Sequence, residues 1–414
     1  MKLGIVANEY FDRFVGRMGG FGFAAQQAIR VFRDDPSLGV EVVCLPGERL
    51  RFPDPERPYV HGVRAVPYRR GSRWAALAHA AAVRAERPDV LLAIDYRPSY
   101  RRIFRALPRT PVIVWVRDPR TPADWDRIDS LQVPGEERAR PRGIGRIDCT
   151  SMRREAAVSR LLRRPFLAAT LAPHLGAEER MRETYGMTAP VHFLPNIVPA
   201  PAVPVEKAER PRVIFLGRLD PIKRPWIVFA LAERMPEVDF VVVGQAHFTG
   251  KGAWVPATLP ANLQLVGHLE GAEKSRLLGS AWLALNTSIH EAVAFSLFEA
   301  LAHRTPMVSG VEMGGLPARF GAYVGRFDGS GMEGVGAFEG ALRGLLADHE
   351  RRERLGREGQ AWVARTHNRD AFVDAFAGLC ERAGLRAPGR GTRPLALPHR
   401  VPYGGVHGPD RAPA

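Results

Sequence analysis

Short apolar runs alternate along most of the chain with longer stretches in which apolar residues recur at helical spacing. A short and nearly continuous apolar run predicts a strand of a parallel sheet, because helices cover both faces of such a sheet. In the first half, these runs predict strands at 2–7, 40–45, 90–94, 112–117, 166–171 and 191–194. The amphipathic stretches predict helices at 21–33, 73–86, 99–106, 152–163 and 176–185.

The same alternation returns in the second half. Strands are predicted at 212–217, 239–243, 263–266, 282–286 and 306–309, and helices at 224–235, 271–279, 294–303, 337–347, 350–365 and 370–384. Between the halves, residues 195–204 contain four prolines, which cannot continue a helix or a central strand. The pattern predicts two doubly wound α/β domains, 1–195 and 211–369, joined by a linker at 196–210 and facing each other across a cleft.

The two ends of the chain depart from this alternation. Residues 370–385 predict a last helix, which we expect to pack back on the first domain, and 386–414 predict a disordered basic tail. The N-terminus turns polar too early for a signal peptide, and no apolar run approaches the ~20 residues that span a bilayer. Three cysteines lie far apart, at Cys44, Cys149 and Cys380. We therefore expect a cytoplasmic protein.

The formal net charge is +15, and it is unevenly distributed. Residues 1–200 hold 33 Lys and Arg against 22 Asp and Glu, residues 201–385 hold 21 against 21, and residues 386–414 hold 5 against 1. One interpretation is a first domain that meets an anionic lipid surface at the inner membrane face, a lipid-linked phosphate or an acidic glycan. The other is biased arginine usage, since the chain has 54 arginines and five lysines. We expect no nucleic-acid partner, because such a partner would be inferred from the net charge and from no other feature of the sequence.

Two cations follow the first strand of the second half. Arg218 and Lys223 lie on the loop that leads into the helix at 224–235. Cations at the carboxyl end of a strand, beside a helix N-terminus, suit a diphosphate group. The alternative is a pair of exposed loop cations. The rarity of lysine in this chain favours a specific role for Lys223.

Two carboxylates, Glu291 and Glu299, stand on either side of the start of the helix at 294–303. The Glu291 carboxylate can accept hydrogen bonds from sugar hydroxyls. Backbone N–H groups of residues about 293–296, which include Ala294 and Phe295, remain free at a helix start and can face a phosphate. Glu299, one to two turns into the helix, can accept from both hydroxyls of a ribose. The alternative, a capping acid and a surface acid, fits poorly with a helix that is apolar on nearly every side.

Weaker features accompany this pair. The glycine-rich segments 19–22 and 314–317 would let the backbone approach a ligand closely, and an ordinary turn is the alternative for the second. Arg117 and Asp118 end the strand at 112–117, where they can face the cleft or form an ion pair. Segment 19–22 lacks the full dinucleotide-binding spacing, which argues against a dehydrogenase. No metal site is predicted, because metal-ligand spacing is missing from His174, His290 and His303.

Together these residues resemble a GT-B glycosyltransferase of the retaining family 4 type, also called group 1. The resemblance covers about residues 1–385 and is strongest over 212–317. It rests on Gly-Gly-Phe-Gly at 19–22, Phe-Leu-Gly-Arg-Leu-Asp-Pro-Ile-Lys at 215–223, Val-Val-Val-Gly at 241–244, Leu-Val-Gly-His-Leu at 265–269, the acids at 291 and 299, and Gly-Gly-Leu-Pro at 314–317.

The resemblance implies a role for each matched residue. Arg218 and Lys223 would hold the donor diphosphate, Glu291 would contact the transferred sugar, and Glu299 would contact the ribose. The other donor-binding positions would be Gly20, Gly22, Gly244, Gly267, Ala294 and Phe295. The family moves a sugar, such as a hexose, from a nucleoside-diphosphate sugar to an acceptor hydroxyl with retention and usually without a metal or another cofactor. The acceptor would be a glycan, a glycolipid or a small molecule.

Two positions differ from the family pattern. Ala292 and Ala294 stand where the family usually has glycines, and Arg117 stands where it often has a histidine. Arg117 and Asp118 are therefore candidates for the acceptor side, where a cation could meet a charged donor sugar or an acidic acceptor. These differences leave two alternatives open: a non-catalytic GT-B protein that binds a nucleotide sugar or a protein, and a sugar-nucleotide epimerase.

Overall fold

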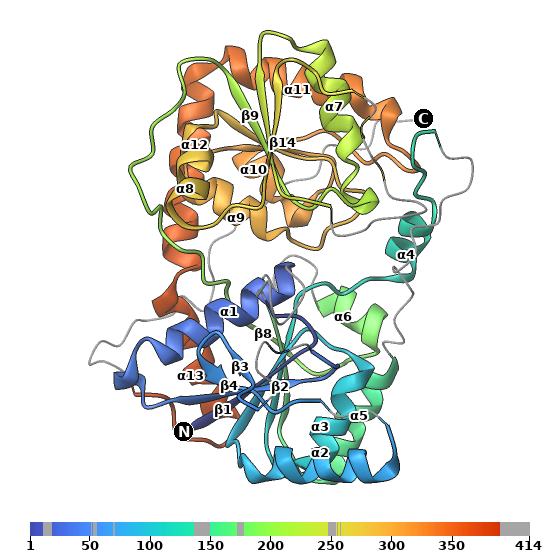
Figure 1. Ribbon diagram of the computed structural model, residues 1–414, viewed down its shortest axis with the longest axis vertical. Helices are drawn as coiled ribbons and strands as arrows, with labels where there is room; N and C mark the ends of the chain where they lie inside the picture. Colours follow the sequence, from blue (N-terminus) through green and yellow to red (C-terminus); the bar gives the residue numbers. More distant parts are fainter. Residues whose placement is uncertain are drawn as a thin grey trace, which may run out of the picture.

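The computed structural model describes residues 1–10, 19–50, 52, 56–68, 71–135, 150–171, 178–246, 254, 256 and 258–389. Figure 1 shows two α/β domains, one above the other. The tail from residue 390 onward, Cys149 and His174 lie outside the described residues. In the described part of the chain, no helix has the length and apolar character needed to cross a membrane.

The first domain is built on a six-stranded parallel sheet in the order β2-β1-β5-β6-β7-β8. Its strands are β1 (Lys2–Ala7), β2 (Glu41–Pro46), β5 (Val90–Ile94), β6 (Val112–Val116), β7 (Phe166–Thr170) and β8 (Val191–Phe193). Its helices are α1 (Gly20–Arg33), α2 (Arg73–Ala85), α3 (Arg101–Ala106), α4 (Pro122–Asp129), α5 (Thr150–Leu161) and α6 (Glu178–Tyr185). Every residue of β5 and β6 is buried, which explains their unbroken apolar runs.

The second domain repeats this design with the order β11-β10-β9-β12-β13-β14, again all parallel. Its strands are β9 (Arg212–Leu216), β10 (Asp239–Val243), β11 (Leu263–Gly267), β12 (Leu283–Asn286), β13 (Met307–Ser309) and β14 (Gly321–Tyr323). Its helices are α7 (Pro225–Arg234), α8 (Gly271–Ser280), α9 (Phe295–Ala302), α10 (Leu316–Phe320), α11 (Val335–Ala347) and α12 (His349–Thr366). The predicted α/β class with two parallel sheets is confirmed.

The prediction missed the strand β14, the helices α4 and α10, and the small antiparallel hairpin of β3 (Tyr59–Val60) and β4 (Val63–Arg64). The strands of the hairpin have two residues each and β14 has three, so none is long enough to display a period. α4 contains too few apolar residues to show a helical hydrophobic pattern, although Thr121 and Asp124 form a capping box at its start.

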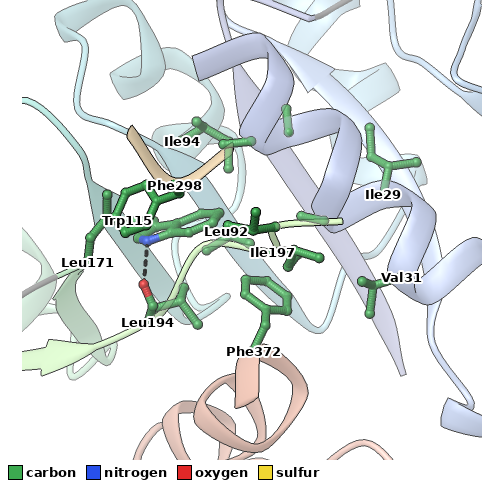
Figure 2. Packing of buried hydrophobic residues seen from close by; sticks show 14 of the residues in the cluster. Ile29, Val31, Leu92, Ile94, Trp115, Leu171, Leu194, Ile197, Phe298 and Phe372 are labelled. Atoms are coloured by element: carbon green, nitrogen blue, oxygen red, sulfur yellow. Dashed lines mark hydrogen bonds between the residues drawn. The ribbon is translucent and has the colours of Figure 1, made fainter. Parts of the chain in front are cut away.

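Aromatic packing joins the last helix, α13 (Arg369–Arg382), to the first domain. Figure 2 shows Phe372 of α13 beside Trp115 of β6, and their ring centroids are 5.4 Å apart. Phe376 lies 5.2 Å from Phe32 of α1. The same buried apolar cluster also contains Phe298 of α9 in the second domain. The two domains therefore share an apolar contact near the points where the chain crosses between them.

The first crossing is held in place by His367, which follows α12. The backbone N–H of Asn196 donates to His367 Nδ1 at 3.1 Å, and the N–H of Val198 donates to the His367 carbonyl at 2.9 Å. Asn196 is completely buried. The proline-containing segment is therefore tied to the second crossing at this point.

The topology of the second sheet indicates where a ligand binds. β9 lies between β10 and β12, so the chain winds outward through β10 and β11 on one side and through β12, β13 and β14 on the other. In open α/β sheets, ligands bind beyond the carboxyl ends of the strands at such a switch point. The loops after β9 and β12 meet there, because the N–H of Ile289 donates to the carbonyl of Ile222 at 3.0 Å.

Candidate functional site

The loops after β9 and β12 bring Lys223 and Glu291 into contact. Lys223 Nζ donates to Glu291 Oε1, and Ser288 Oγ donates to the same oxygen at 2.8 Å. The hydroxyl of Thr287 fixes the backbone beneath this pair by donating to the Lys223 carbonyl at 2.7 Å. Both charged side chains remain partly accessible, at 20% and 14%. The structure therefore joins two residues that the sequence selected separately.

A strained turn directs Lys223 toward this contact. Arg224, the next residue, has a left-handed backbone with φ of 47°, a conformation that few residues other than glycine adopt. Its guanidinium donates to the Phe327 carbonyl at 2.5 Å. The turn ends a short 3₁₀ helix and starts α7. A backbone held out of its common conformations in this way is typical of functional sites.

Arg218 stands apart from the Lys223–Glu291 pair. Its side chain is 42% exposed, and its Nη1 lies 3.2 Å from Asp220 on the same loop. An exposed guanidinium whose one ion pair is screened by solvent stays accessible to a phosphate. The role of Arg218 in diphosphate binding remains a prediction.

Glu299 contacts a lysine that the sequence analysis did not select. Lys274 of α8 donates to Glu299 Oε1 at 2.6 Å, and its ammonium lies 5.4 Å from the centre of the Phe23 ring in α1. Lys274 is one of five lysines in the chain, and this rarity is the sequence feature that could have pointed to it. Phe23 also packs on Phe295 at the start of α9, with ring centroids 4.6 Å apart. The first domain therefore reaches the helix that carries Glu299.

The backbone N–H of Ala294, at the start of α9, differs from the prediction. The backbone N–H of Ala294, expected to be free, donates to the sulfur of Met313 at 3.3 Å. Ala294 is also buried, with 5% of its surface exposed. A thioether is a weak acceptor, so this N–H has a partner even though the helix start itself carries no side-chain cap. The expectation of a free N–H at Ala294 was wrong.

The predicted donor-binding glycines fall into two groups. Gly244, after β10, donates its N–H to the Gly267 carbonyl at the end of β11 at 2.7 Å. Both have positive φ, at 144° and 74°. Gly20 and Gly22 lie at the start of α1, the helix that carries Phe23. Their contacts with a donor remain predictions.

The geometry of Gly244 leads to a stability prediction. A β-carbon there would lie 2.0 Å from the Gly217 carbonyl oxygen. Gly244→Ala should therefore destabilise the fold by about 1–3 kcal/mol, because the loop after β9 must move and the positive φ becomes strained. Urea denaturation measures this loss. Gly336→Ala is the matched control, because nothing lies within 4 Å of its β-carbon position in α11. Equal stability of the two variants would contradict the close approach.

A histidine links the two domains beside Glu291. His290 Nε2 lies 2.9 Å from Asp118 Oδ1, and His290 Nδ1 lies 3.4 Å from Asp124 Oδ1. Only the doubly protonated imidazole donates to both carboxylates. Burial alone would lower the pKa of His290, but Asp118 and Asp124 outweigh it and raise the pKa, although Arg120 opposes them. Burial would raise the pKa of Asp118, but Arg120 and His290 hold it well below its usual range.

The link should weaken at alkaline pH. The pKa of His290 is raised in the folded chain, so its stabilising effect is present below the unfolded pKa of about 6.5 and is lost as the pH rises through the higher folded value. The wild type should therefore melt at a higher temperature than His290→Gln near pH 6. This difference should shrink as the pH rises through the raised folded pKa of His290. A difference that does not change with pH would contradict a protonated His290.

A cavity of about 240 Å³ opens between the domains next to this link. Its first-domain wall includes Arg117, Arg127 and Arg180, and its second-domain wall includes Glu291 and Arg326. Arg117 and Asp118, the predicted acceptor-side pair, follow β6 directly but diverge. Arg117 lines the cavity, whereas Asp118 binds His290 and Arg120. Among the described residues, no group of three His, Cys, Asp or Glu side chains is arranged to hold a metal ion.

Comparisons with known proteins agree with this architecture. Residues 200–362 match the family Glycosyl transferases group 1. The sucrose-phosphate synthase of Thermosynechococcus elongatus has a similar structure, with a TM-score of 0.66 at 17% identity over 92% of this chain and 98% of that one. Anabaena HepE in complex with UDP-glucose gives a TM-score of 0.64 at 14% identity over 93% and 99%.

A third structure is similar along its whole length. WaaG, a glycosyltransferase involved in lipopolysaccharide biosynthesis, gives a TM-score of 0.57 at 13% identity over 92% of this chain and 99% of that one. No curated protein sequence matches the chain significantly. The chain therefore has the GT-B fold of these glycosyltransferases, and its second domain matches the group 1 glycosyltransferase family.

Proposed function

We propose that the protein is a retaining glycosyltransferase of the family 4 type, which moves a sugar from a nucleoside-diphosphate sugar to an acceptor hydroxyl. The observation that carries this proposal is the contact of Lys223 with Glu291 at the switch point of the second sheet. A cation for phosphates and an acid for hydroxyls stand side by side there, inside the segment that matches the group 1 family.

In this proposal the donor lies along the carboxyl ends of β9, β10 and β12. Lys223 and Arg218 bind the diphosphate and stabilise the charge that develops as it leaves, which metal-independent transfer requires. Glu291 accepts hydrogen bonds from the sugar, and Glu299 accepts them from the ribose. Lys223 must then turn from Glu291 to the phosphates. The pair in the free protein keeps both charges compensated until the donor arrives.

The nucleotide base and the place of action belong to the same proposal. HepE was solved with UDP and with UDP-glucose, which makes UDP-sugars the first donors to test. We also propose that the protein acts in the cytoplasm, where thiols stay reduced. Cys44 and Cys380 are buried free thiols. Contact of the basic first domain with an anionic membrane stays a prediction.

A thermal-shift screen tests the donor proposal. UDP, GDP, ADP and their glucose conjugates are added separately, and one series should raise the melting temperature, because ligands that bind only the folded state stabilise it. Release of free nucleotide with an acceptor present then separates an enzyme from a binding protein. Product analysis without an acceptor separates an epimerase from a transferase. No stabilisation by any of these nucleotides would contradict the proposal.

A further inference from the structure

The cavity between the domains contains a buried cation without a counter-ion. Arg117 is 6% exposed. Its Nη2 donates to the neutral Asn196 side chain at 2.8 Å, and its Nε and Nη1 have no hydrogen-bond partner among the described residues. The guanidinium lies 4.6 Å from the centre of the Trp115 ring. In the described part of the chain, no carboxylate lies within ion-pair distance of it.

Such an arrangement is costly in a folded protein. Removing a charge from water without giving it a partner is unfavourable, and buried charges are therefore usually paired. Burial lowers the pKa of Arg117 to about 10, even though Asp95 and Glu9 act in the opposite sense. The Asp95 carboxylate accepts from the backbone N–H of Arg117 at 3.2 Å and forms no ion pair with its guanidinium. The neighbouring arginines, by contrast, form ion pairs. Arg180 binds Asp124 at 2.6 Å, and Arg127 binds Asp328 at 3.0 Å.

The other charged side chains that line the cavity also leave an excess of positive charge. Four arginines line it, Arg117, Arg127, Arg180 and Arg326, against the three carboxylates Asp124, Glu291 and Glu312. Asp124 and Glu291 already bind cations. Glu312 lies 3.9 Å from Arg326, and both are about half exposed, a contact that contributes little. An anion entering the cavity would therefore meet uncompensated positive charge.

We propose that this cavity binds a negatively charged group of a substrate, a carboxylate or a phosphate, and that Arg117 supplies its counter-charge. The inference rests on the proposed glycosyl transfer, because the cavity borders Glu291. A volume of about 240 Å³ is below the roughly 300–1,000 Å³ of pockets for drug-sized ligands, which suits one sugar unit. The charged group belongs either to the transferred sugar or to the acceptor.

Matched ligand pairs that differ in charge at one carbon separate these sources. The donor arm compares binding of UDP-glucuronate with that of UDP-glucose. The acceptor arm compares methyl glucuronide with methyl glucoside, and glucose 6-phosphate with glucose, each with and without UDP. Titration calorimetry should give at least about tenfold tighter binding of the charged member in one arm. The arm that shows this preference identifies the source.

Variants test whether Arg117 causes the preference. Arg117→Met keeps the length of the side chain and should abolish the preference while leaving UDP affinity unchanged, and Arg117→Lys should restore part of it. Arg343→Met, outside the cavity and half exposed, should behave as wild type. Should Arg117→Met fail to fold, Arg326→Met should still weaken the preference.

Two outcomes would overturn the proposal. One is equal binding of charged and neutral ligands by the wild type in both arms, and the other is a preference that survives in folded Arg117→Met. Binding of UDP alone reports separately on the donor site. If UDP binds and no charge preference exists, this inference fails while the proposed function stands. If no nucleotide binds, the proposed function itself fails.

Discussion

Lys223→Ala should lower the rate of sugar transfer by about a hundred- to a thousandfold, because it removes a cation placed to stabilise the leaving diphosphate. The same change should weaken binding of the nucleoside diphosphate, since charge-assisted hydrogen bonds to phosphate are among the strongest that a side chain makes. Steady-state kinetics and titration calorimetry measure the two effects.

The fold should survive this change. Glu291 loses its cation but keeps the hydrogen bond from Ser288, and its carboxylate is 14% exposed. Arg210→Ala is a suitable control, because that side chain is 63% exposed and lies two residues before β9 begins, at the opposite end of the strand from the site. A folded Lys223→Ala protein with full turnover would refute the assignment of the donor site.

Glu291→Gln should lower the turnover number by about a hundredfold or more, while leaving the affinity for the free nucleoside diphosphate unchanged or higher. Glutamine keeps the shape of the side chain but loses the negative charge that meets the sugar hydroxyls and the reacting centre. It also releases Lys223 from its ion pair, which makes that cation available to the phosphates.

The contrast between the two variants distinguishes their roles. Lys223→Ala should weaken both nucleotide binding and turnover, whereas Glu291→Gln should weaken turnover alone. Ser288→Ala is a milder control, because it removes one hydrogen bond to Glu291 and leaves the charge in place. Loss of nucleotide affinity in Glu291→Gln equal to that in Lys223→Ala would contradict separate roles for the two residues.

Burial on both faces made most of the fold predictable from the sequence. The residues of β5 and β6 are entirely apolar and buried, so each appears as an unbroken run. β14, by contrast, consists of Gly321, Ala322 and Tyr323, and three residues cannot display a period. The start of α4 did carry a signal in Thr121 and Asp124, but a capping box without an apolar stripe gave no reason to extend a helix from it.

The candidate site could likewise be predicted only in part. Lys223 and Glu291 could be selected because each follows a predicted strand of the same sheet, and carboxyl ends of parallel strands meet. The partners that surround them could not be selected. Asp118 lies 172 residues from His290, and Lys274 lies on a different helix from Glu299. No local pattern encodes such contacts, since they arise when two domains and two separate helices pack.

The unpaired state of Arg117 is the clearest example of information that only the structure provides. In the sequence, Arg117 and Asp118 could form an ion pair or face the cleft. In the structure, Asp118 binds Arg120 and His290, which leaves Arg117 with the neutral Asn196. The sequence therefore shows which charges Arg117 and Asp118 carry but not which residues they bind.

A crystal structure with the best-binding nucleoside-diphosphate sugar, starting with UDP-glucose, tests the central claim most directly. We expect the diphosphate to contact Lys223 and Arg218, the ribose to contact Glu299, and the sugar to lie against Glu291. A nucleotide bound elsewhere, or a diphosphate that touches no residue of the loop after β9, would contradict the account.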